Sequence, residues 1–180
     1  ATSGADVADR PSRVEVKAAG ERPSALSVSA RFQLLPSSTA WTSATASGDY
    51  GRRELTIRCN GLDTRWGAAD LKAIAHSTAA AVVVPKVSSV AYLDHVSALL
   101  DDGGAPDTMT VWAMIETPTA ILDVRAIASH PRVSVLVMGT NDLAREIRAP
   151  LAPGRRALLP HLATALLAAR EAGNMVDLDS

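Results

Sequence analysis

The sequence predicts an α/β fold in which parallel strands alternate with helices. From about residue 50 onward, short apolar stretches alternate with amphipathic ones, and successive strands begin roughly 25–30 residues apart. This alternation is typical of parallel strands joined by right-handed crossovers. Hydrophobic residues make up 47% of the 180 residues but aromatic ones only 3%, so aliphatic side chains must build the core. Periodicity alone does not separate an open doubly wound sheet from a barrel.

The overall composition excludes several classes of protein. The net charge of −1 gives no reason to expect nucleic acid or an anionic membrane as a partner. No run of 18 apolar residues is present, so we expect no transmembrane helix. Cys59 is the only cysteine, which rules out an internal disulfide and favours a cytoplasmic location.

Residues 1–47 differ in composition from the rest of the chain. They are rich in Ala, Ser and Thr, with Pro11, Pro23 and Pro36 scattered among them. Only Ala25–Leu35 has a weak strand-like pattern. We therefore expect residues 1–47 to be an irregular segment outside the folded domain.

The first two strand–helix units have distinct patterns. Glu54–Asn60 is a strand candidate, and Trp66–Ser77 places its apolar residues on one helix face. Ala79–Val84 is short and wholly apolar, as in a parallel strand that is buried on both faces. Ser89–Leu100 is the next predicted helix, and Gly103 ends it.

The third unit begins with the strand Met109–Ile115. Thr117 then caps a helix, and Pro118 occupies its first turn, where a missing N–H costs nothing. Val133–Met138 is the fourth predicted strand.

Two helices are predicted to follow the fourth strand. Asp142–Ile147 is short, whereas Arg156–Ala172 is longer and ends at Gly173. We expect the folded domain to span residues 48–173 and residues 174–180 to be a tail.

Each predicted strand closes on polar residues. The first ends at Arg58 and Asn60, and the others are followed by Lys86, by Glu116, and by Asn141 with Asp142. In parallel α/β folds the C-terminal ends of the strands carry the active site, because the loops converge there. This set offers two carboxylates for a hard cation and two positive charges for anionic substrate groups.

Glu116 and Asp142 follow consecutive strands, so their carboxylates can approach one ion. Mg²⁺ prefers oxygen ligands and usually takes one or two carboxylates together with waters and substrate oxygens. Neither residue has a His or Cys nearby, which argues against zinc. The alternative is that each carboxylate only caps the helix that follows it; their pairing on adjacent strand ends favours Mg²⁺.

The two cationic residues leave alternatives open. Arg58 lies in a largely apolar strand, where a buried guanidinium needs a partner. The side chain forms either a structural salt bridge or a contact with a substrate carboxylate or carbonyl. Lys86 is a solvated loop lysine or a substrate contact.

Four segments in order resemble the citrate lyase β-chain-like family, which includes malyl-CoA, citramalyl-CoA and hydroxymethylglutaryl-CoA-type lyases. They are RELTIRCNGLDTRWGAADL (Arg53–Leu71), VVVPKVSS (Val82–Ser89), AMIETPTAIL (Ala113–Leu122) and VLVMGTNDLARE (Val135–Glu146). The segment Pro153–Gly173 also looks like these proteins.

The resemblance implies a TIM barrel that assembles as a homo-oligomer and acts on acyl-CoA thioesters. It implies that Glu116 and Asp142 bind Mg²⁺, which stabilises the enolate formed as the carbon–carbon bond breaks. It also implies that Arg58 is the catalytic residue that contacts the substrate beside the metal. We assign Lys86 and Asn141 to substrate binding.

The sequence also departs from the family pattern. The family opens with strands ending in VPG and in a DLEDAV-like motif, which are absent here, and it continues past Gly173 with two more strands. We therefore expect an incomplete TIM barrel of about four consecutive strand–helix units. Cys59 stands where an aliphatic residue is usual, and we interpret it as a buried strand residue and not a nucleophile.

Three functions follow from these observations. The first is a Mg²⁺-dependent carbon–carbon lyase of a 3-hydroxyacyl-CoA of the citryl-, malyl- or citramalyl-CoA type. The second is a truncated, non-catalytic remnant of such a lyase. Either residues 1–47 and a partner chain complete the fold, or the chain is a truncated or misassembled gene product, and the missing motifs favour the latter. The third is a related aldolase that acts on free 2-keto acids.

Overall fold

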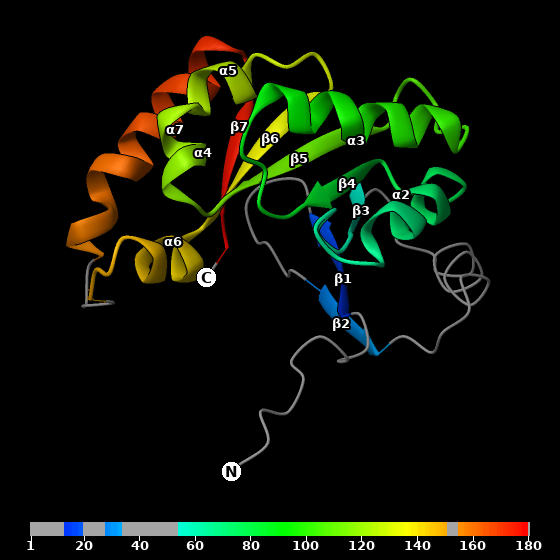
Figure 1. The fold of residues 1–180 in the computed structure, drawn as a ribbon, viewed down its shortest axis with the longest axis horizontal. Helices are drawn as coiled ribbons and strands as arrows, with labels where there is room; N and C mark the ends of the chain where they lie inside the picture. The colour runs from blue at the N-terminus through cyan, green and yellow to red at the C-terminus, as the bar shows by residue number, and fades with distance from the viewer. Residues whose placement is uncertain (1–12, 20–27, 34–53, 151–154, 180) are drawn as a thin grey trace.

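The computed structural model describes residues 13–19, 28–33, 54–150 and 155–179. The strands in these ranges form one seven-stranded sheet, and Figure 1 shows their arrangement. The order in the sheet is β2-β1-β3-β4-β5-β6-β7. The last five are neighbouring parallel strands, whereas β1 pairs antiparallel with both β2 and β3. The strands are β1 (Arg13–Ala19), β2 (Val28–Gln33), β3 (Glu54–Arg58), β4 (Ala81–Val84), β5 (Thr110–Ile115), β6 (Val133–Gly139) and β7 (Met175–Asp179).

Helices connect the parallel strands, as the alternating pattern predicts. They are α2 (Gly67–Ala75), α3 (Val90–Asp102), α4 (Pro118–Leu122), α5 (Val124–Ala128), α6 (Thr140–Glu146), the 3₁₀ turn η2 (Arg156–Leu158) and α7 (Leu159–Glu171). The predicted cap is confirmed, because the Thr117 hydroxyl accepts a hydrogen bond from the Ala120 N–H at 3.2 Å. Ser89 caps α3 in the same way through the Tyr92 N–H. Gly173 follows α7 at φ 78°, a left-handed conformation that favours glycine.

The structure corrects the predictions for the two ends of the chain in part. Residues 1–47 contain β1, which was not predicted, and β2, which lies within the weakly strand-like stretch Ala25–Leu35. The residue pairs Val16–Ile57 and Lys17–Thr56 join β1 to β3. Met175–Asp179 is strand β7 and not part of a tail, because it pairs with β6 from Val135 onward. The parallel part of the sheet therefore has five strands and not four. The rest of residues 1–47 lies outside the described residues.

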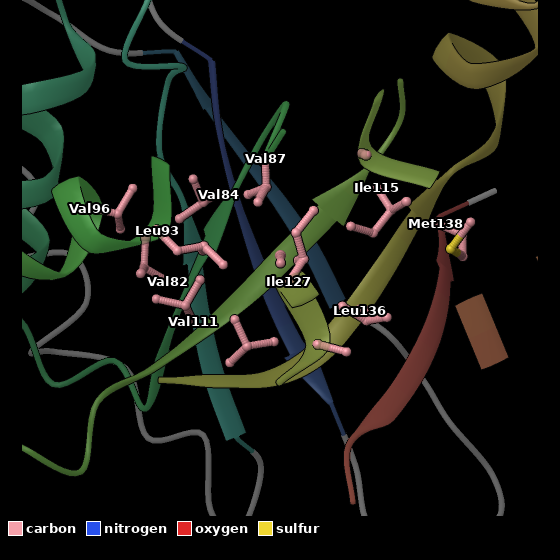
Figure 2. Close-up of a cluster of buried hydrophobic side chains, with 14 of the residues drawn as sticks. Val82, Val84, Val87, Leu93, Val96, Val111, Ile115, Ile127, Leu136 and Met138 are labelled. Atoms are coloured by element: carbon pink, nitrogen blue, oxygen red, sulfur yellow. The ribbon is translucent and has the colours of Figure 1, made fainter. Parts of the chain in front are cut away.

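Aliphatic side chains build the core, as the composition predicts. Alternate residues of the strands point toward the helices, where they meet residues of α3 and α5 (Figure 2). The labelled members of this cluster are Val82, Val84, Val87, Leu93, Val96, Val111, Ile115, Ile127, Leu136 and Met138. A second buried cluster on the opposite face of the strands comprises Ala81, Val83, Trp112, Met114, Val135 and Val137. Burial on both faces explains why these strands read as continuous apolar runs.

None of the helices in the described ranges is long and apolar enough to cross a membrane.

Candidate active site

A pocket of about 350 Å³ lies at the C-terminal ends of β3, β4 and β5 and reaches the first turn of α6. Its lining residues are Arg58, Cys59, Asn60, Gly61, Asp63, Thr64, Pro85, Lys86, Glu116 and Asp142. The structure thus brings together four of the five residues proposed from the sequence. The fifth, Asn141, is exposed on α6 and does not line the pocket.

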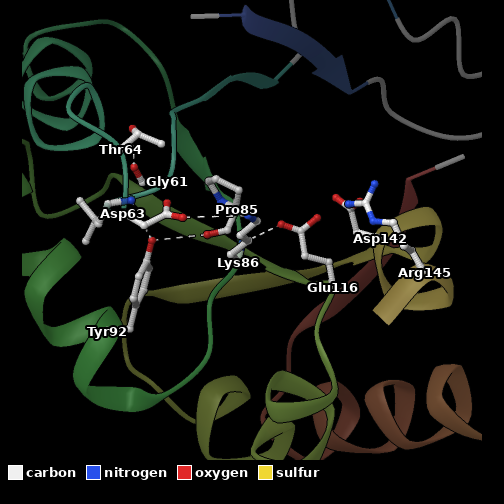
Figure 3. Close-up of polar contacts among 10 residues, drawn as sticks. Gly61, Asp63, Thr64, Pro85, Lys86, Tyr92, Glu116, Asp142 and Arg145 are labelled. Carbon is white, nitrogen blue, oxygen red and sulfur yellow. Dashed lines mark hydrogen bonds and ion pairs between the residues drawn. The ribbon is translucent and has the colours of Figure 1, made fainter. Parts of the chain in front are cut away.

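Glu116 follows the last residue of β5 and is almost completely buried, with 2% of its surface exposed. Its Oε1 accepts a hydrogen bond from the backbone N–H of Lys86 at 2.8 Å. Figure 3 shows the carboxylate between Lys86 and Asp142. The carboxylate therefore accepts a hydrogen bond from the turn after the neighbouring strand β4. It does not cap α4, whose cap is Thr117.

The pKa of Glu116 is raised above its ordinary value, chiefly because burial disfavours the charged form. The Lys86 N–H and the positive charge of Arg58 oppose this shift, whereas the neighbouring Asp142 carboxylate adds to it. Two carboxylates so close together repel each other when both are charged. A bound cation would relieve that repulsion.

Asp142 lies in the first turn of α6 with 35% of its side chain exposed. Its Oδ1 forms an ion pair with Arg145, one turn further along the same helix. No side chain caps the start of α6, which begins after Gly139. The interpretation that the two acidic residues only cap helices therefore does not describe this arrangement.

Lys86 adopts a left-handed backbone conformation with φ 51° in the turn after β4, which the chain enters through Pro85. This turn aims its backbone N–H at Glu116. Its side chain is mostly exposed, and Nζ lies 4.0 Å from Oδ2 of Asp63. The contact with the buried carboxylate is therefore made by the backbone of Lys86, whereas its side chain lies at the edge of the pocket.

Arg58 is the last residue of β3 and is half-buried. Its charge is close enough to lower the pKa of Glu116. No ion pair joins it to a carboxylate within the described part of the chain. Arg58 lines the pocket together with Glu116 and Asp142.

Neighbouring residues hold the two loops that frame the pocket. The backbone N–H and side-chain amide of Asn60 both donate to Oδ2 of Asp70, at 3.0 and 2.5 Å. Burial raises the pKa of Asp70, and these hydrogen bonds oppose the shift. The Tyr92 hydroxyl accepts from the Leu62 N–H at 3.2 Å and lies 3.5 Å from the Pro85 carbonyl oxygen. Tyr92 of α3 therefore fastens both loops.

Sequence reasoning missed Tyr92 and Gly139. Gly139 leaves the space that the Glu116 side chain occupies, since a Cβ at position 139 would lie 2.6 Å from the Cβ of Glu116. A glycine placed between an apolar strand and an acidic helix start was the available signal for Gly139. Nothing in the sequence pattern marks Tyr92, which looks like an ordinary residue of an amphipathic helix.

The donor set matches magnesium better than zinc. In the described residues, no group of three or more His, Cys, Asp or Glu side chains is arranged to hold a metal. Two carboxylates with room for water and substrate oxygens are the usual protein contribution to a Mg²⁺ site. Cys59 is buried, as predicted, and burial raises the pKa of its thiol to about 12, so it is not a nucleophile at neutral pH.

Two curated relatives are similar to this chain. Over 127 residues it is 46% identical to the (3S)-malyl-CoA thioesterase of Cereibacter sphaeroides. The matched region covers 71% of this chain and 42% of the thioesterase. Over 130 residues it is 32% identical to citrate lyase subunit beta of Escherichia coli, covering 69% of this chain and 43% of that one. The chain thus spans less than half the length of these relatives.

A solved structure is similar as well. The citrate lyase beta subunit of Mycobacterium tuberculosis, complexed with oxaloacetate and magnesium, matches with a TM-score of 0.57 and 25% identity over 68% of this chain and 53% of that one. The predicted α/β, TIM-barrel-like fold class is confirmed by this likeness and by the five parallel strands. Residues 29–179 match the description HpcH/HpaI aldolase/citrate lyase. The chain therefore belongs to the HpcH/HpaI aldolase/citrate lyase family.

Proposed function

We propose that Glu116 and Asp142 bind Mg²⁺ in a carbon–carbon lyase that acts on a 3-hydroxyacyl-CoA of the citryl-, malyl- or citramalyl-CoA type. The observation that carries this proposal is the buried Glu116 carboxylate, which faces Asp142 in a pocket that also contains Arg58. A carboxylate that is removed from water and placed beside a second one favours a cation as its partner.

The surroundings of the two carboxylates fit a hard divalent cation. One oxygen of Glu116 is held by the Lys86 N–H, which leaves the other for a ligand. Asp142 remains partly exposed, so its carboxylate can reach water and substrate. When bound, Mg²⁺ would polarise a substrate carbonyl and stabilise negative charge as the carbon–carbon bond breaks. A relative of known structure was complexed with oxaloacetate and magnesium, which supports this choice of metal.

The other predicted residues have separate roles in the proposal. Arg58 holds a substrate carboxylate or carbonyl oxygen beside the metal, because its guanidinium donates in a planar, bidentate geometry. Lys86 contacts an anionic group through its exposed side chain at the edge of the pocket. Asn141 remains a proposed substrate contact next to Asp142 in the chain, although it does not line the pocket. We extend the proposal to a homo-oligomer in the cytoplasm.

Thioester hydrolysis is the second candidate. It is favoured by the 46% identity to a (3S)-malyl-CoA thioesterase. The same pocket could serve either reaction, since both involve negative charge that develops on an oxygen of the substrate. In hydrolysis water attacks the thioester carbonyl and the thiol of CoA leaves, whereas the lyase leaves the thioester intact.

Metal binding is tested by unfolding with and without millimolar Mg²⁺. We expect Mg²⁺ to raise the free energy of unfolding by about 2.7 kcal/mol at 100 times the dissociation constant. Glu116→Gln and Asp142→Asn should each remove this gain. Asp107→Asn is the matched control, because Asp107 is exposed in the loop before β5. Wild-type protein that gains no stability from Mg²⁺ would sink the metal site.

The reaction is tested by the products formed from malyl-CoA. A lyase releases acetyl-CoA and glyoxylate without free thiol, whereas a thioesterase releases malate and free CoA thiol. We expect the first pair, with loss of product formation in Arg58→Ala. Mg²⁺ binding without either product would favour the non-catalytic remnant, and turnover of free 2-keto acids alone would favour the aldolase.

A further inference from the structure

Gly139 lies directly beside Glu116 at the ends of two parallel strands. Ile115 and Met138 are register partners in β5 and β6, so Glu116 and Gly139 follow as the next pair. A Cβ at position 139 would lie 2.6 Å from the Cβ of Glu116 and 2.8 Å from its Oε2. Both separations are shorter than packed side chains allow.

The requirement for glycine at position 139 comes from space and not from backbone conformation. Gly139 has φ −76°, a value that any residue adopts. An added methyl group would meet the Cβ of Glu116, an atom fixed by its own backbone. Rotation of the carboxylate alone therefore cannot relieve the clash, and strands β5 and β6 must also move apart.

The opposite side of the same carboxylate is fixed by a hydrogen bond. Oε1 accepts from the Lys86 N–H at 2.8 Å, and the left-handed turn at Lys86 sets the direction of that N–H. Oε2 lies next to the empty position above Gly139. The two oxygens of Glu116 are thus distinguished by their neighbours.

We infer that Gly139 is a positioning residue for the metal site. Because Gly139 lacks a side chain, the Glu116 carboxylate fits between β6 and the Lys86 N–H. From that position Glu116 would hold the cation. This inference rests on the proposed function, because it specifies how one of the two proposed ligands is held.

The test compares Gly139→Ala with Gly103→Ala in the full chain. Gly103 is the matched control because a Cβ there would lie 2.8 Å from the Cβ of Ala75, a similar clash where α3 packs on α2. The Mg²⁺ dissociation constant is measured by calorimetry and metal-free stability by urea unfolding. We expect Gly139→Ala to weaken Mg²⁺ binding by about 10-fold or more, as for other residues that orient metal ligands. Gly103→Ala should lower stability without changing Mg²⁺ affinity.

A second readout needs no metal. The amide proton of Lys86 donates to Glu116, so its NMR chemical shift in wild-type protein reports this hydrogen bond. In Gly139→Ala the Lys86 amide resonance should move toward its position in Glu116→Ala, whereas Gly103→Ala should keep the wild-type position. Wild-type Mg²⁺ affinity or a wild-type Lys86 amide shift in Gly139→Ala would overturn the inference. Absence of Mg²⁺ binding in wild-type protein would instead overturn the proposed function, while the Lys86 amide would still decide whether Gly139 positions Glu116.

Discussion

Glu116 and Asp142 share one pocket but differ in their contact with solvent. Glu116 is 2% exposed, whereas 35% of the Asp142 side chain is exposed. The folded protein therefore bears an energetic cost mainly at Glu116, where desolvation outweighs the Lys86 hydrogen bond and the Arg58 charge. Asp142 completes the pair from the helix side and has Arg145 as its own partner.

The raised pKa of Glu116 predicts how stability depends on pH. Because the folded state binds this proton more tightly than the unfolded chain, metal-free protein should lose stability as the pH rises from the unfolded pKa to the raised folded pKa. Above that window the loss stays constant. We expect the free energy of unfolding of wild-type protein to fall relative to that of Glu116→Gln over this range, measured by urea unfolding. Asp70, whose pKa is also raised, is present in both proteins and cancels.

With Mg²⁺ bound, the free energy of unfolding should rise and not fall with pH across this window, because the metal requires the deprotonated Glu116 carboxylate. Mg²⁺ affinity should therefore increase with pH across the same window. Wild-type protein that gains stability relative to Glu116→Gln as the pH rises without metal would contradict the assignment of a buried, destabilised carboxylate.

In the turn after β4, the backbone and the side chain of Lys86 have different partners. The Lys86 backbone contacts the buried Glu116, while its side chain reaches the exposed Asp63. The sequence suggested only a role for the Lys86 side chain, and none for its backbone N–H. Whether a lysine in a loop uses its backbone or its charge depends on the φ angle of the turn, here 51°.

Lys86→Gly tests this division. Glycine adopts the left-handed conformation without the strain of a Cβ, so the turn and its N–H should be kept, with a change in stability of about 1 kcal/mol or less. We expect unchanged Mg²⁺ affinity but a raised KM for the acyl-CoA substrate. Lys86→Ala is the comparison, because it removes the same side chain but retains left-handed strain. Loss of Mg²⁺ binding in Lys86→Gly would show that the side chain itself supports the metal site.

Helix α3 connects the loops after β3 and β4 through one hydroxyl group. Tyr92 contacts Leu62 from the first loop and Pro85 from the second. The loop after β3 is also held to α2 by the two hydrogen bonds from Asn60 to Asp70. The pocket walls are therefore set by the helices behind the strands, and not only by the strands themselves.

The sheet as a whole explains why the site forms where it does. Five parallel strands end at the same edge, so residues separated in the chain, such as Arg58 and Asp142, line one pocket. Buried clusters on both faces of β4, β5 and β6 hold these strands in register. The antiparallel strand β1 pairs with the other side of β3.

Much of this architecture could be predicted from residue patterns. The apolar runs at β4, β5 and β6 are buried on both faces, a condition that leaves a clear mark in the sequence. Strand β1 was missed although Arg13–Lys17 alternates charged and apolar residues, a pattern typical of a strand. Strand β7 is short, and its strand structure depends on pairing with β6. Pairing partners are a tertiary property that local periodicity does not contain.

The sequence by itself determined the alternation of strands and helices, the aliphatic core, and the polar residues that follow each strand. These follow from hydrophobic periodicity, which acts between near neighbours in the chain. Only the tertiary structure decided which atoms surround Glu116: the backbone N–H of Lys86, the empty position at Gly139 and the carboxylate of Asp142. The physical reason is that these contacts depend on the backbone angle at Lys86 and on distances of a few ångströms between residues far apart in the chain. The spacing of residues along the sequence encodes neither the angle nor the distances.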